Sequence, residues 1–271
     1  METGWCKSNP GFFFAIFAGL RLAFVTAAEK RPTVTRPDRT ALTVLVAHNL
    51  IQNEVLDEKA YVTGNLIVTS TLLAIARSAG LDRDDIGLQP GDLRSGASLG
   101  LAATITSLLT AVVAARLPSL NARLRDQRLP AESLPDVVRR ALIRFPIGTA
   151  LFEEVAFRGV LPPLLSRDDA GVSGDARSAL VFALWHLIPT HQALRVNNVG
   201  QTRLVRLAGT LVGAMAAGVA GYALSRVRRR TGSLLASWLI HSSVNAGSYL
   251  ATARVRLHSD GQPADLPIST G

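Results

Sequence analysis

Cysteine is almost missing from this chain of 271 residues, because Cys6 is the single one. That scarcity excludes an intrachain disulfide framework and any cysteine-based zinc site. Lysine is scarce as well, so the net charge of +9 comes almost wholly from arginine. The HExxH, GxSxG and P-loop patterns are also missing. Their absence removes the sequence signatures of the common zinc proteases, serine hydrolases and nucleotide-binding proteins.

Charged residues make up 18% of the chain and apolar residues 48%, with a mean hydropathy of +0.26. This balance favours a membrane protein over an ordinary soluble domain, although an Ala-rich soluble helical domain is the alternative. The arginines form short clusters between apolar runs, as in 139–144, 203–206 and 226–230. Such clusters are typical of membrane-flanking loops rather than of one basic face, so we expect no nucleic-acid partner.

Apolar segments of about the length that crosses a bilayer follow one another from residue 41 onward. We expect an all-α fold, a polytopic transmembrane bundle of about 7–8 membrane helices with a catalytic cavity in its interior. Small residues recur every four positions from Gly209 through Gly213 and Ala217 to Gly221, which predicts a helix-contact stripe. The segments lie near 41–56, 60–76, 96–115, 140–163, 178–194, 207–225 and 233–252.

The chain divides into three parts by composition. Residues 1–40 hold an apolar run, 11–25, that is typical of a signal peptide, a short anchor or a start-site extension, followed by a linker. The membrane domain spans 41–252, and a polar tail spans 253–271. Loop charge places 77–94 outside the cytoplasm and 116–144 inside. Strict alternation of the segments then puts the basic stretch 226–230 outside, which contradicts the rule that basic loops lie in the cytoplasm.

Ionisable residues interrupt the apolar segments at a few points, where a charge costs at least ~2.5–3.5 kcal/mol. Glu154 and Arg158 are four residues apart, the favourable order for an ion pair on one helix face. Glu153 sits about 100° around the helix from Glu154 and has no local cation. The three side chains form either one packing network or a structural pair beside an unpaired carboxylate that serves as a general acid or base.

Two histidines, His186 and His241, also lie inside apolar segments. Asn245 is one turn from His241 on the same face and could donate to a developing oxyanion. Two schemes stay open. A divalent metal such as zinc, held by Glu153, His186 and His241, could activate a water, or Glu153 could deprotonate the water directly with histidine assistance. Both imply hydrolysis in a water-containing cavity between helices.

Three ordered motifs, EEVAFR (153–158), FALWH (182–186) and HSSVN (241–245), resemble those of the CPBP family. This family comprises the intramembrane CAAX-type prenyl endopeptidases (CAAX prenyl protease 2) and the Abi-like bacteriocin-processing and immunity proteins. The resemblance covers roughly residues 90–250. It is carried by a double Glu followed by Arg, by Phe and His separated by three residues, and by His and Asn separated by three residues.

The resemblance implies a catalytic cavity lined by four residues. Glu153 with His186 would activate the water, and His241 with Asn245 would support the oxyanion or a metal. Supporting residues follow from the same motifs: Glu154, Arg158 and Phe182 would hold the geometry of the site. The family was named for metal dependence, yet a metal-free glutamate mechanism has also been argued for it, so zinc stays open.

The resulting expectation is a multi-pass endopeptidase of the plasma membrane that hydrolyses a peptide or protein substrate, with lipid modification of that substrate left open. The alternative is a non-catalytic membrane scaffold or bacteriocin immunity-type protein with the same fold. Retention of Glu153, His186, His241 and Asn245 favours catalysis, because a scaffold gains nothing from buried ionisable groups that cost several kcal/mol.

Overall fold

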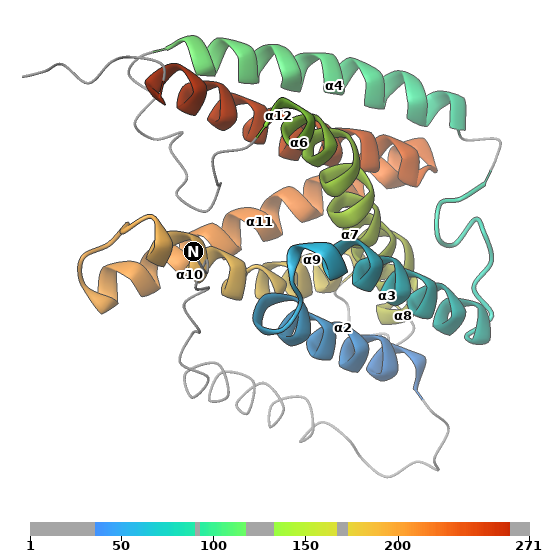
Figure 1. The fold of residues 1–271 in the computed structure, drawn as a ribbon. Coiled ribbons are helices and arrows are strands. Elements are labelled where there is room, and N and C mark those ends of the chain that lie inside the picture. The colour runs from blue at the N-terminus through green and yellow to red at the C-terminus, as the bar shows by residue number, and fades with distance from the viewer. Residues whose placement is uncertain (1–35, 90–92, 118–132, 167–172, 261–271) are drawn as a thin grey trace, which may run out of the picture.

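The computed structural model describes residues 36–89, 93–117, 133–166 and 173–260, and these ranges are helical with no strand. The predicted all-α class is therefore confirmed (Figure 1). The helices are α2 (Pro37–Glu54), α3 (Glu58–Ser78), α4 (Leu93–Arg116), α6 (Leu134–Arg139), η2 (Arg140–Leu151), α7 (Phe152–Glu154), η3 (Val155–Val160), α8 (Leu161–Leu165), α9 (Gly174–Trp185), α10 (Leu187–Val196), α11 (Arg203–Thr231) and α12 (Leu234–Asp260).

Each of the seven predicted apolar segments falls on observed helix. Among the described residues, three helices are long and apolar enough to cross a membrane, namely Glu58–Ser78, Gly96–Ala114 and Arg203–Thr231. Two helices extend past the predicted membrane domain of 41–252. Helix α2 begins at Pro37, inside the predicted linker, because proline suits the first turn of a helix, and α12 continues to Asp260 into the predicted tail. The predicted anchor at 11–25 lies outside the described residues.

The predicted segment 178–194 is two helices rather than one, and the break falls at His186. Pro189 explains the break, because it has no N–H to donate to the carbonyl of Trp185, four residues earlier. The side-chain amide of Asn49, on α2, donates to that carbonyl instead, at 3.1 Å. A contact between distant segments therefore replaces the missing helical hydrogen bond.

The central helical path, residues 134–165, alternates between α-type and wider π-type turns. The two π-type stretches, η2 and η3, flank the short α7 that carries both glutamates. At the end of η3 the N–H of Leu161 reaches the carbonyl of Ala156, so the next π-type donor would be Pro162, which has no N–H. The carbonyl of Phe157, which would have paired with residue 162, accepts a hydrogen bond from the hydroxyl of Ser178 at 2.6 Å instead.

Close helix packing depends on small residues. Helices α4 and α12 run side by side (Figure 1), and Gly96 and Gly100 of α4 face Ser233 and Leu239.

The predicted stripe on α11 is also in contact with its neighbours. Gly209 faces Leu194, Gly213 faces Thr190, and Gly221 faces Phe182. The helix-contact prediction is confirmed.

The loop after α3 and the end of α11 lie at the same end of the bundle. Arg228 donates to the carbonyls of Asp84 and Asp85, and the N–H of Leu234 donates to the carbonyl of Gly87 at 2.9 Å. Arg229 forms an ion pair with Asp175, at the start of α9. The segments 77–94 and 226–230 therefore lie at the same end of the bundle, as strict alternation predicts. Part of the basic charge of 226–230 is paired there with an acidic side chain and with carbonyl groups. The membrane orientation itself stays a prediction.

We expect Gly221→Val to destabilise the bundle. A β-carbon alone would lie 2.7 Å from Cδ1 of Phe182 and 3.1 Å from Nη2 of Arg158. Overpacking of this kind costs about 1–3 kcal/mol, which thermal unfolding in detergent would detect as a lower midpoint. Ala220→Val, on the exposed face of the same helix, is the matched control and should change stability by less than about 0.5 kcal/mol. Equal midpoints for the two variants would contradict the contact.

Candidate active site

An ion pair between Glu154 and Arg158 lies at the centre of the candidate site. The carboxylate Oε1 is 3.1 Å from Nη1 of Arg158, and the two side chains are 1% and 0% exposed. The guanidinium lies 4.1 Å above the ring of Phe182, a favourable cation–π placement. The ion pair predicted from the four-residue spacing is confirmed, and Phe182 supports it from α9.

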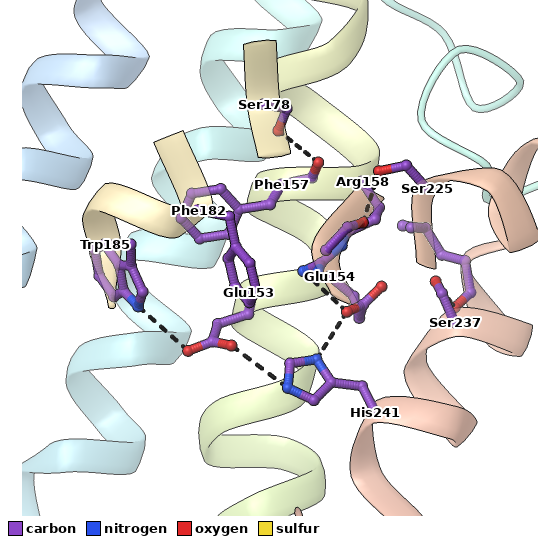
Figure 2. Close-up of polar contacts among 12 residues, drawn as sticks. Glu153, Glu154, Phe157, Arg158, Ser178, Phe182, Trp185, Ser225, Ser237 and His241 are labelled. Carbon is purple, nitrogen blue, oxygen red and sulfur yellow. Dashed lines mark hydrogen bonds and ion pairs between the residues drawn. The ribbon is translucent and has the colours of Figure 1, made fainter. Parts of the chain in front are cut away.

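His241 of α12 contacts both glutamates (Figure 2). Its Nδ1 is 2.8 Å from Oε1 of Glu154, and its Nε2 is 3.5 Å from Oε2 of Glu153. A carboxylate can only accept, so the Nδ1–H donates to Glu154. The contact between Nε2 and Glu153 is attractive only when one proton is shared between them. The structure therefore joins Glu153, Glu154 and His241 in one cluster.

Glu153 is 6% exposed, and its two carboxylate oxygens have different surroundings. Oε1 accepts a hydrogen bond from the indole N–H of Trp185 at 3.3 Å. Oε2 faces His241 and has no hydrogen-bond partner in the part of the chain that the structure describes. Sequence reasoning missed Trp185, although a signal was present: the residue directly precedes His186 in an apolar segment, and a buried indole N–H needs an acceptor.

His186 and Asn245 lie beside this cluster without joining it. The ring of His186 is 4.3 Å from that of Phe182, and its Nδ1 lies 2.9 Å from the carbonyl of Phe182. That nitrogen must carry the hydrogen, so Nε2 is the acceptor in the neutral ring. Within the described residues, no hydrogen bond or ion pair joins His186 to Glu153 or His241. Asn245, one turn beyond His241, is partly buried and has no side-chain hydrogen bond there.

In the part of the chain that the structure describes, no group of three or more His, Cys, Asp or Glu side chains could hold a metal ion. Glu153 and His241 are close together, Glu154 is paired with Arg158, and the ring of His186 packs against Phe182. Glu153, His186 and His241, the predicted ligands, do not form such a group there, and zinc binding stays a prediction.

Residues 137–247 match the family model described as type II CAAX prenyl endopeptidase Rce1-like. All three motifs fall inside this range, so the resemblance to the CPBP family is confirmed over that segment. The family is one of CAAX-type proteases, and a protease implies a peptide or protein substrate. Searches of curated proteins and of solved structures returned no match.

Arg158→Leu should destabilise the protein strongly. It removes the charge partner of Glu154 from a fully buried site, and breaking a buried pair on one side costs about 3–5 kcal/mol. The matched control is Arg139→Leu, which removes an ion pair with Asp136 whose side chains are about half exposed and which should change stability by at most about 1 kcal/mol. Denaturant unfolding in detergent measures both. A small effect of Arg158→Leu would mean that Glu154 is not dependent on this guanidinium.

Proposed function

We propose that this protein is an intramembrane endopeptidase in which Glu153 activates the hydrolytic water. The observation that supports this role is the environment of its carboxylate, which is almost fully buried while Oε2 accepts no hydrogen bond from any described residue. A buried carboxylate oxygen without a donor is a site that a water molecule can occupy. Glu154 differs from Glu153 in its other oxygen, because Arg158 and His241 both hold Oε1 of Glu154, while its Oε2 is likewise buried without a hydrogen-bond partner among the described residues.

The hydrolytic step follows general acid–base chemistry. Glu153 takes a proton from water as the water oxygen forms a bond to the peptide carbonyl carbon. His241 and the nearby amide of Asn245 donate to the oxyanion that develops on the carbonyl oxygen. The proton then passes from Glu153 to the leaving nitrogen as the C–N bond breaks, which yields a carboxylic acid and an amine.

His186 would assist on the opposite side of Phe182. Its Nδ1–H is engaged by the carbonyl of Phe182, which leaves Nε2 as an acceptor for a proton of the water or of the substrate. Glu154, Arg158 and Phe182 would hold His241 and the helix geometry rather than take part in bond making. This division follows the contacts described above and the three motifs of the family.

We further propose that all seven apolar segments cross the plasma membrane, including the three that lie on described helices meeting the length and hydropathy requirement. Large apolar side chains of α4 and α11 are exposed on the bundle surface, among them Leu101, Ile105, Val212 and Val219. Such faces are suited to lipid contact. A substrate would then reach the site from the bilayer, which makes a lipid-modified peptide the first substrate class to test.

The proposed reaction needs no metal. A zinc site with an open position requires three protein ligands, and Glu153 with His241 provides two in contact. The water is therefore activated by the carboxylate itself in this proposal.

In the reconstituted protein, Glu153→Gln should lower the rate of cleavage of a library of lipidated and unlipidated peptides by about 10²–10⁴-fold. The unfolding midpoint should not change. Glu154→Gln is the matched control, since it replaces the adjacent carboxylate. It should lower stability because Arg158 loses its partner, while its folded fraction keeps more activity than Glu153→Gln. Equal activities in the two folded variants would contradict the assignment of Glu153 as the residue that activates the water. Absence of any cleavage by the wild type would favour the non-catalytic scaffold.

Removal of divalent metals should leave cleavage unchanged. The purified protein would be dialysed against a strong chelator, and its metal content and peptide cleavage measured on the same sample. We expect far less than one metal per chain and full activity. Stoichiometric zinc, with activity lost on chelation and restored on zinc addition, would overturn the metal-free proposal.

A further inference from the structure

Trp185 is packed so that its indole ring has little freedom. The ring lies 5.3 Å from Phe152, 5.6 Å from Phe157 and 6.2 Å from His48 between centroids. The residue is 5% exposed. Because neighbours from the central helical path and from α2 surround the ring, its N–H has a fixed direction. That direction is toward Oε1 of Glu153, at 3.3 Å (Figure 2).

The backbone of Trp185 is fixed independently of its ring. Pro189 leaves the Trp185 carbonyl without a helical donor, and the buried amide of Asn49 donates to it at 3.1 Å. His48, the neighbour of Asn49, is hydrogen-bonded to the buried Asn65. A polar contact from α2 thus holds the main chain at the break between α9 and α10, and aromatic packing holds the side chain.

We propose that Trp185 is a positioning residue for the reaction assigned to Glu153. By donating to Oε1 it selects the rotamer of the carboxylate and leaves Oε2, which faces His241, as the oxygen that takes the proton. This inference rests on the proposed function. It goes beyond that function because Trp185 does not touch the reacting atoms and acts through the carboxylate alone.

The competing explanation is that Trp185 only fills space in the core. Trp185→Phe separates the two, because it keeps an aromatic ring and removes the N–H donor. Trp238→Phe is the matched control. Trp238 is partly buried, and its indole N–H donates to another protein oxygen, the carbonyl of Pro146, at 2.8 Å. It therefore removes a comparable hydrogen bond that does not involve Glu153.

We expect Trp185→Phe to lower kcat by about 10- to 100-fold with KM unchanged, the effect of losing a hydrogen bond to a charged group. Trp238→Phe should stay within about twofold of the wild type. In the Glu153→Gln background, Trp185→Phe should have no further effect, because the two residues act as one unit. Equal kcat values for the two Phe variants, or additive effects with Glu153→Gln, would overturn the positioning role while leaving the endopeptidase function in place.

A second measurement does not depend on activity. The chain has three tryptophans, so their indole N–H resonances in a ¹⁵N-labelled sample in nanodiscs can be assigned with the Phe variants. Glu153→Gln should shift the Trp185 indole resonance and leave that of Trp238 in place. An unshifted Trp185 resonance would overturn the proposal even if the wild type cleaved no peptide in the library.

Discussion

The buried ion pair of Glu154 and Arg158 is the interaction on which the rest of the structure depends. Neither side chain is exposed, so neither charge can be left without a partner. Three other helices meet around the pair: α9 contributes the ring of Phe182, α11 leaves space at Gly221, and α12 contributes His241. The position of this one pair on the central path therefore fixes where those helices can lie.

The irregular backbone near the site follows from the same constraint, that a buried polar group needs a partner. Prolines at 162 and 189 each remove a donor from a helix, and in the bundle interior a free carbonyl is costly. Ser178 and Asn49 supply the missing hydrogen bonds. These two side chains also tie α9 to the central path and α2 to the break after Trp185. The breaks in the helices thus determine which segments contact one another around Glu153.

Local spacing predicted the features that depend on one helix alone. The four-residue separation of Glu154 and Arg158 predicted their ion pair, and the repeat ending at Gly221 predicted a contact face. The remaining features depend on segments far apart in the chain. No spacing relates Trp185 to Glu153, or indicates that His241 contacts both glutamates, because helix packing alone sets those distances. The predicted pairing of His186 with Glu153 stays a prediction, because the contacts of His186 described above are with Phe182, whose ring also contacts that of His241.

The charges of the cluster balance only when it is considered as a unit. Glu153 and Glu154 carry two negative charges, and Arg158 carries one positive charge. His241 donates to Glu154 through Nδ1, so its Nε2 can approach Glu153 only with one further proton between them. With that proton the four buried groups carry no net charge together, which lowers the free-energy cost of burying them in an apolar bundle. When that proton is on Nε2 of His241, Oε2 of Glu153 is an unprotonated carboxylate oxygen, as the proposed removal of a proton from water requires.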